Sequence, residues 1–469
     1  MRIENAKRDY LPSLTGLRGI SCLLVILCHC SNLEILSSGA LSGFGTPAVY
    51  FFFVLSGYLL MSRALSEIQS SHIDHPTKFW GASLTSFLIK RIARIYPPYF
   101  VSIWFYYALV SLAKYCQHQE LILQEFDRPL WATFFFEGME SHLWTISNEW
   151  YFYVIVLPII LTLASIIMIW DYKSHRSPKS SFVLLFYLLI TICVSLQQYL
   201  IGNVETGYPS RHDFRVHLPA FWHGSLAGIA GYYSRYYHSN QKQIIGKCFA
   251  EVLVWTLLLR LVLGNSNIMS FYTNYDPQVW WNNSLLVSPF ASSLLFILDI
   301  TDGTTSLARI TSLSIFRKMG EVSYSTYLVH ISVIIIFKWS TDIRGIIGIL
   351  TVTIISFVVG LVMYYLIEKK AEAYGKRLVK YLSEEDIVDR REFVEESNNK
   401  EKVEISEYGK ESVELIVRES HIYRIIRAII YSNNKKACFR GIIYIILVFF
   451  SVNSIILGCT YSNTYKVAV

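Results

Sequence analysis

Arg18 and His29 are separated by ten residues, all apolar or small, in a segment long and apolar enough to cross a membrane. Eleven helical steps of about 100° make roughly three turns, so both side chains lie on one face, about 16 Å apart along the axis. A guanidinium suits phosphate groups, and an imidazole suits general-base work on a hydroxyl. Ionisable groups are unfavourable in lipid and therefore indicate function. The structural alternative is that Arg18 reaches the headgroups and His29 is a hydrogen-bonded core residue.

A second pair of cations, Arg91 and Arg94, comes just before Pro97, which we expect to start the third membrane span. Residues at i and i+3 share a helix face, so the two guanidinium groups can act together. Paired guanidinium groups bind phosphate in a bidentate manner. The alternative is that both residues only set the orientation of the chain in the membrane.

Glu149 lies among aromatic residues, Trp144 included, where the fourth span is predicted to begin. We expect this position to be in the outer half of the membrane. A carboxylate there could act in proton transfer or orient an imidazole, or it could simply favour a helix N-terminus. The aromatic residues could stack on sugar rings or form an interfacial belt.

A polar stripe runs along the predicted ninth span, where Ser323, Tyr324, Tyr327 and His330 punctuate an apolar sequence. The two tyrosines and the histidine recur at every third position, so they face one side of a helix. Two intramembrane histidines on separate spans, His29 and His330, suggest a shared cavity. We expect that cavity to join His29 to Arg18.

These residues need helices to position them, and the composition predicts an all-α, polytopic transmembrane helical bundle. Of the 469 residues, 53% are hydrophobic and only 16% are charged. Apolar windows of about 20 residues indicate membrane helices. We predict about ten core spans and an eleventh after a charged linker, near residues 18–34, 46–64, 97–114, 150–169, 182–201, 217–234, 249–264, 283–299, 323–339, 345–367 and 440–458.

Lys and Arg residues gather in every second predicted loop, which places the N-terminus in the cytoplasm. The same loops explain the net charge of +7, so no nucleic-acid partner is expected. The eight cysteines include no CxxC pair and lie mostly in apolar spans. This distribution favours buried thiols, and no metal site is predicted.

Three regions follow from the charge pattern. Residues 1–370 form the transmembrane domain, and residues 371–438 form a charged cytoplasmic linker. The linker contains apolar positions at helical spacing, which suit either an amphipathic helix on the membrane or a helix packed on the bundle. Residues 439–469 hold the eleventh span and a short outer tail.

Taken in order, these segments resemble the acyltransferase 3 family of integral-membrane acyltransferases, which includes O-antigen and polysaccharide O-acetyltransferases. The resemblance covers roughly residues 10–370, and Thr15 and Lys90 depart from the family pattern. It rests on five ordered blocks and a weaker sixth: Leu14 to Gly19 with His29, Phe52 to Gly57, Lys90 to Pro97, Trp144 to Tyr153, Ser323 to His330, and Tyr365 to Lys369.

The resemblance implies an acyl-CoA donor on the cytoplasmic side and a carbohydrate or glycolipid hydroxyl as acceptor. It points to Arg18 and His29 as the family's arginine–histidine pair, to Arg91 and Arg94 as its basic motif, and to Glu149. Larger relatives carry an outer esterase-like domain. We expect none here, so a separate outer partner could complete the transfer.

The predicted function is therefore O-acetyl transfer from acetyl-CoA to a cell-surface polysaccharide such as O-antigen or lipopolysaccharide, in a bacterial inner membrane. His29 would act as general base or as a transient acyl carrier, with Glu149 assisting. Arg18, Arg91 and Arg94 would bind acyl-CoA. The substrate path would use Trp144, Ser323, Tyr324, Tyr327 and His330. The alternative is a proton-coupled transporter, which would need discontinuous helices or repeats that the sequence does not show.

Overall fold

The computed structural model describes residues 11–35, 41, 44–70, 85–116, 141–156, 214–237, 250–256, 284–301 and 303–382. Within these ranges the labelled elements are all helical. They are α1 (Pro12–Asn32), α2 (Gly45–Ser70), α4 (Thr85–Tyr115), η4 (Ser141–Leu143), α6 (Trp144–Tyr151), η5 (Phe152–Val156), α9 (Phe214–Tyr237), α13 (Ser284–Ile300), α14 (Ser306–Thr311), α15 (Ser314–Glu321), α16 (Ser323–Ser340), α17 (Gly345–Met363) and η7 (Tyr364–Glu368).

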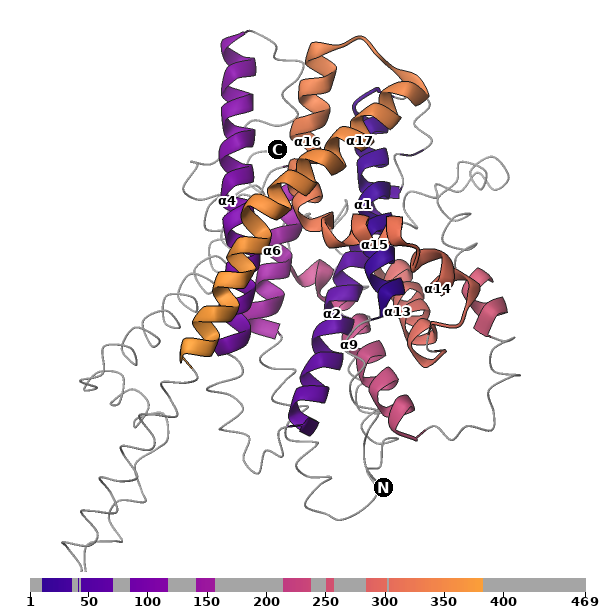
Figure 1. The fold of residues 1–469 in the computed structure, drawn as a ribbon. Coiled ribbons are helices and arrows are strands. Elements are labelled where there is room, and N and C mark those ends of the chain that lie inside the picture. The colour runs from indigo at the N-terminus through magenta and orange to yellow at the C-terminus, as the bar shows by residue number, and fades with distance from the viewer. Residues whose placement is uncertain are drawn as a thin grey trace, which may run out of the picture.

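Helices that are distant in the sequence pack side by side (Figure 1). α2 lies along α9, and both contact α13. α1 packs against α2, α15 and α16, so it occupies a central position. α16 also contacts α4 and α17. The helices that carry the predicted site residues therefore meet around α1 and α16.

Several predicted spans correspond to helices. The ninth span begins at Ser323, as predicted, and the helices α2, α9, α13 and α17 coincide with predicted spans to within a few residues. The helix that contains the third predicted span starts earlier than the predicted residue, Pro97, because α4 begins at Thr85 and continues through Pro97 and Pro98. Arg91 and Arg94 therefore lie within this helix and not in a loop before it. The spans predicted at 182–201 and 440–458, and most of the charged linker, lie outside the described residues.

By length and composition, three helices of the described residues can cross a membrane. They are Pro12–Asn32, Pro47–Ser66 and the continuous helix Gly345–Leu382. α15 and α16 pass the same test together, although they bend by 75° at Val322. The sequence did not show this discontinuous pair. The total of about ten spans stays a prediction.

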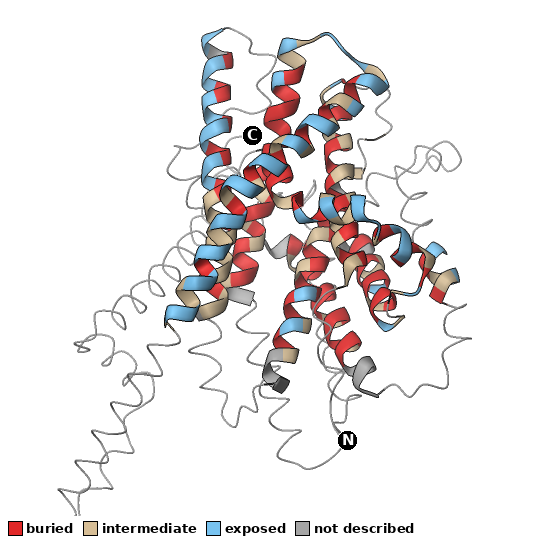
Figure 2. Ribbon diagram, in the orientation of Figure 1, coloured by how far each residue is buried: buried red, intermediate tan, exposed pale blue. Residues whose placement is uncertain are grey.

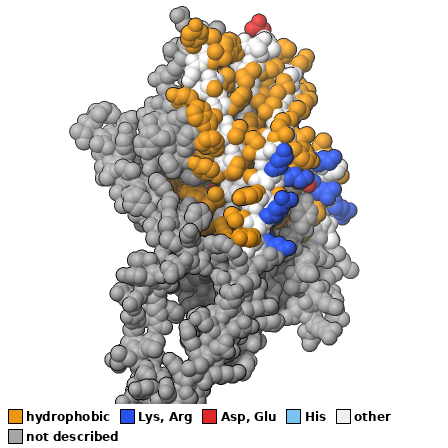
Figure 3. Space-filling view, turned by 60° about the vertical axis from the view of Figure 1, so that its left-hand side comes forward, with side chains coloured by type: hydrophobic (Ala, Val, Ile, Leu, Met, Phe, Trp, Pro, Cys, Tyr) orange, Lys and Arg blue, Asp and Glu red, His pale blue; other side chains and the backbone are white. Residues whose placement is uncertain are grey.

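The outer face of the bundle has the pattern of a surface in lipid. Buried residues line the interior of the bundle, whereas α17 exposes one side along its length (Figure 2). Exposed apolar side chains of α17 include Ile346, Ile354 and Val358. One face of the molecule is mainly apolar, with Lys and Arg side chains gathered toward one end (Figure 3). The continuous helix Gly345–Leu382, which begins with α17, ends with the exposed basic residues Lys369, Lys370, Lys376, Arg377 and Lys380.

α2 and α9 approach closely at two glycines, Gly57 and Gly224. A Cβ atom added at Gly57 would collide with the carbonyl oxygen of Phe221, and one added at Gly224 would collide with that of Val54. Small residues are the usual contact points between membrane helices because they let the backbones approach. This contact fixes the position of Ser56.

We expect Gly224→Val to reduce the amount of folded protein severely, because the new side chain would force α9 away from α2. Overpacking of this kind destabilises by about 1–3 kcal/mol or more. Yield and thermal unfolding in detergent would measure the effect. Ser225→Ala is the control, since Ser225 bonds only the Phe221 carbonyl of its own helix. Equal stability of both variants would contradict the close contact.

Candidate functional site

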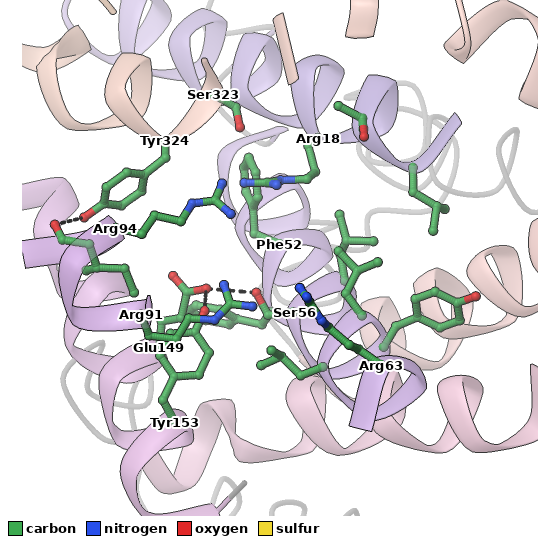
Figure 4. Close-up of a pocket in the computed structure, with 18 of the residues that line it drawn as sticks. Arg18, Phe52, Ser56, Arg63, Arg91, Arg94, Glu149, Tyr153, Ser323 and Tyr324 are labelled. Atoms are coloured by element: carbon green, nitrogen blue, oxygen red, sulfur yellow. Dashed lines mark hydrogen bonds between the residues drawn. The ribbon is translucent and has the colours of Figure 1, made fainter. Parts of the chain in front are cut away.

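A cavity of about 390 Å³ lies between α1, α2, α4, α6 and α16. Its lining contains the three arginines that the sequence singled out, Arg18, Arg91 and Arg94, together with a fourth, Arg63. Arg18 comes from α1, Arg63 from α2, and Arg91 and Arg94 both from α4, and Figure 4 shows that Arg18 and Arg94 point toward one another. We refer to this space as the arginine cavity.

The arginine cavity has an excess of positive charge. Among the described residues that line it, Glu149 is the only acidic one. Arg18 makes no hydrogen bond or ion pair with any described residue, although its guanidinium points into the cavity. Electrostatic attraction is stronger here than in water because the surroundings are of low dielectric constant. The cavity is therefore suited to a ligand with several negative charges.

Arg94 is held in place by Glu368, an acidic residue that is distant in the sequence. Its Nε lies 3.4 Å from Oε1 of Glu368, which is completely buried. The Ser325 hydroxyl donates a hydrogen bond of 2.6 Å to the other oxygen of this carboxylate. The sequence analysis placed Glu368 only in the weakest block of the resemblance and gave it no role.

We expect Glu368→Ala to lower the stability of the protein. Removing one partner of a buried ion pair costs about 3–5 kcal/mol, and less here because Arg94 is partly exposed. Thermal unfolding in detergent would record the loss. Ser325→Ala, which removes only the hydrogen bond, should have a smaller effect. The ion pair would be unimportant if Glu368→Ala unfolded at the wild-type temperature.

Glu149 lies on the opposite wall, close to Arg91. The Ser56 hydroxyl donates to Oε1 of Glu149 at 2.9 Å, and the Tyr153 hydroxyl donates to the same oxygen (Figure 4). The Arg91 guanidinium lies over the Phe87 and Tyr153 rings, at 5.3 and 5.4 Å from their centroids. The sequence suggested no contact between Glu149 and the arginines, whereas the structure places them around one space, and the position of Glu149 in the outer half of the membrane stays a prediction. The carboxylate belongs to the arginine cavity.

Both carboxylates are placed with the help of π-helical segments. Tyr153 belongs to η5, which directly follows α6, and Glu368 ends η7, which interrupts the long helix of α17. A π-helical turn contains an extra residue and is frequently found at functional sites. In both cases the wider turn carries a residue that contacts a charged group of the cavity.

Three histidines, His29, His142 and His330, form a cluster deeper in the fold, hereafter the histidine cluster. The His330 ring centroid lies 5.1 Å from that of His29 and 4.9 Å from that of His142. The sequence predicted that His29 and His330 meet, and it missed His142. That histidine lies two residues before Trp144, and its approach to α16 depends on the tertiary fold.

Backbone contacts assign the tautomers of two of these rings. Nε2 of His142 lies 3.0 Å from the Leu328 carbonyl, and Nδ1 of His330 contacts the Tyr327 carbonyl. A carbonyl only accepts hydrogen bonds, so each of these nitrogens carries a proton in the neutral ring. His330 Nε2 is then an unprotonated nitrogen. It is buried and has no hydrogen-bond partner among the described residues, so the cluster contains a nitrogen able to accept a proton.

Tyr327 lies between the arginine cavity and the histidine cluster. Its side chain lines the cavity, while its ring centroid lies 5.4 Å from that of His330 and 5.7 Å from that of His142. His29 is not among the residues that line the cavity. The structure thus differs from the expectation that Arg18 and His29 face one passage, because the aromatic ring of Tyr327 stands between the two compartments.

The remaining predicted residues divide between the cavity and the core. Ser323 and Tyr324 line the cavity, and the Tyr324 hydroxyl donates to the Ile95 carbonyl at 2.8 Å. Trp144 does not line the cavity, and its place on the substrate path stays a prediction. Its ring packs against His217, with centroids 4.9 Å apart. Among the described residues, no three His, Cys, Asp or Glu side chains are grouped to hold a metal ion.

Residues 11–367 match the family model described as an acyltransferase domain, acyltransferase 3, and the chain therefore belongs to that family. Family membership and the long apolar helices make it an integral membrane protein. The resemblance inferred from the ordered motifs is thereby confirmed.

The chain is similar to O-acetyltransferase OatA of Staphylococcus aureus (strain NCTC 8325 / PS 47), with 26% identity over 359 residues, covering 72% of this chain and 52% of the relative. It is also similar to a putative O-acetyltransferase of Staphylococcus aureus (strain COL), with 24% identity over 347 residues, covering 70% and 51%. The chain thus spans about half the length of these curated relatives. No solved structure matches it.

Proposed function

We propose that this chain is a membrane O-acyltransferase that moves an acetyl group from acetyl-CoA to a hydroxyl of a cell-surface carbohydrate. The observation that carries the proposal is the arginine cavity, in which Arg18 points toward Arg94 and forms no hydrogen bond or ion pair with any residue that the structure describes. Coenzyme A carries several phosphate groups, and guanidinium groups bind phosphate well. The names of the similar O-acetyltransferases support acetyl as the group transferred.

The chemistry assigned to the histidine cluster is proton transfer. In the proposed step, the oxygen of the acceptor hydroxyl forms a bond to the thioester carbonyl carbon, and His29 accepts the proton of this hydroxyl. The carbon–sulfur bond then breaks, and the departing thiolate takes the proton back from the imidazolium. A hydroxyl is a poor nucleophile at neutral pH, and a positioned base contributes about 10²–10⁴ in rate.

The proposed orientation places the arginine cavity toward the cytoplasm of a bacterial cell. The exposed lysines and arginine at the end of the α17 helix support this orientation, because basic residues gather on the cytoplasmic side. Acetyl-CoA would then enter from the cytoplasm and the carbohydrate acceptor from the opposite side. A separate partner could carry the acetyl group onward.

Transfer of label tests this function. Membranes containing the chain would be incubated with acetyl-CoA labelled in the acetyl group, and the glycan fraction would be measured. NMR of glycans from cells with and without the protein would locate the ester. Label in the glycan only when the chain is present is the expected result, and its absence would contradict the proposal.

The same assay separates the enzyme from a proton-coupled transporter. The 75° bend between α15 and α16 is the kind of discontinuous helix pair that transporters use, so this alternative has one structural observation in its favour. A transporter would move protons across proteoliposomes without transferring label. Proton movement in the absence of acetyl-CoA would therefore favour the transporter.

A further inference from the structure

Tyr327 is held in a fixed position between the two compartments of the site. Its hydroxyl donates to the His142 carbonyl at 2.6 Å and accepts from the Thr145 hydroxyl at 2.9 Å. The side chain is 7% exposed, and its ring contacts His142 and His330. The ring cannot move aside without breaking the two hydrogen bonds of its hydroxyl.

Phe52 faces Tyr327 from another helix. The centroids of the two rings are 6.4 Å apart, with the rings 63° from parallel, and both side chains line the arginine cavity. Phe52 lies beside Arg18 in Figure 4. An acyl group attached to a donor held by the arginines must pass these two rings to reach His29. Beyond them, His142 and His330 are almost fully buried and leave little room.

We propose that Tyr327 and Phe52 form an aromatic partition that restricts transfer to short acyl groups. This inference rests on the proposed acyltransferase function and concerns which donors that function accepts. An apolar site distinguishes substrates that differ by one methylene by about 10- to 200-fold. Acetyl and butyryl groups differ by two methylenes, so a fixed partition would separate them clearly.

The test is a competition between two donors. Membranes containing the full chain would receive equal amounts of acetyl-CoA and butyryl-CoA, each labelled in the acyl group, and the ratio of the two labels in the glycan would be measured. Phe52→Ala and Tyr327→Leu are expected to raise the butyryl-to-acetyl ratio at least about tenfold. A ratio is informative because partial misfolding lowers both rates equally.

Phe51→Ala is the matched control, since Phe51 neighbours Phe52 on α2 and is buried, but does not line the cavity. The butyryl-to-acetyl ratio of Phe51→Ala should equal that of the wild type. Tyr327→Phe keeps the ring but loses both hydroxyl bonds, so its ratio should lie between those of the wild type and Tyr327→Leu. An unchanged ratio in both Phe52→Ala and Tyr327→Leu, with acetyl transfer preserved, would overturn the partition while leaving the proposed function intact. No transfer of either label by the wild type would overturn both.

Discussion

His29→Ala is expected to reduce acetyl transfer by at least about 100-fold, because the proposed reaction loses the base that takes the hydroxyl proton. The imidazole of His29 contacts His330, and two of the three rings of the cluster have their tautomers set by backbone carbonyls. Label transfer per unit of folded protein in membranes would measure the loss.

His223→Ala is the control for removing a buried histidine. His223 contacts the Pro219 carbonyl of its own helix and does not line the cavity. This variant should retain most of its activity per folded molecule. Near-wild-type transfer by His29→Ala, with normal yield, would end the assignment of His29 as the base.

Arg18→Ala is expected to weaken acetyl-CoA binding by about 10- to 150-fold, since a hydrogen bond to a charged group contributes about 1.5–3 kcal/mol. The loss should appear mainly as a higher KM for acetyl-CoA. Arg94 is partly neutralised by Glu368, whereas Arg18 has no hydrogen-bond or ion-pair partner among the described residues and is available to a ligand. Initial rates of label transfer over a range of acetyl-CoA concentrations would give KM.

Arg18→Lys should restore only part of the affinity, because an ammonium group cannot form the bidentate contact of a guanidinium. Arg344→Ala is the control for a lost positive charge. Arg344 is exposed, bonds to nearby backbone carbonyls and does not line the cavity. An unchanged KM in Arg18→Ala would contradict the role of the cavity in donor binding.

Most of the charged residues that line the cavity could be predicted because they stand in or beside apolar segments, but Arg63 was not predicted. Arg18, Arg91 and Arg94 were identified in this way, and the structure brings all three to one cavity. Their roles stay predictions. The helical fold was also predictable, since long apolar runs favour helices that satisfy their own backbone hydrogen bonds.

Other features depend on contacts between distant segments and could not be predicted. Glu368 has a role because η7 packs against α4, and His142 because its ring reaches α16. The hydrogen bond from Ser56 to Glu149 likewise joins residues that are far apart in the sequence. The start of α4 at Thr85 was not predicted, because Pro97 suggested a helix N-terminus. Proline is tolerated inside membrane helices where neighbouring groups satisfy the backbone.

The π-helical segment Tyr364–Glu368 makes the contact between Glu368 and Arg94 sensitive to the number of residues in the segment. A π-helical turn holds about one residue more than an α-helical turn, so deletion of a single residue here would tighten the turn that carries Glu368. Glu368 would then lose its present approach to Arg94, whereas the lysines beyond it would stay on nearly the same side of the helix. At this place in the protein, we expect the number of residues in the segment to be constrained more strictly than the identity of most of the neighbouring side chains.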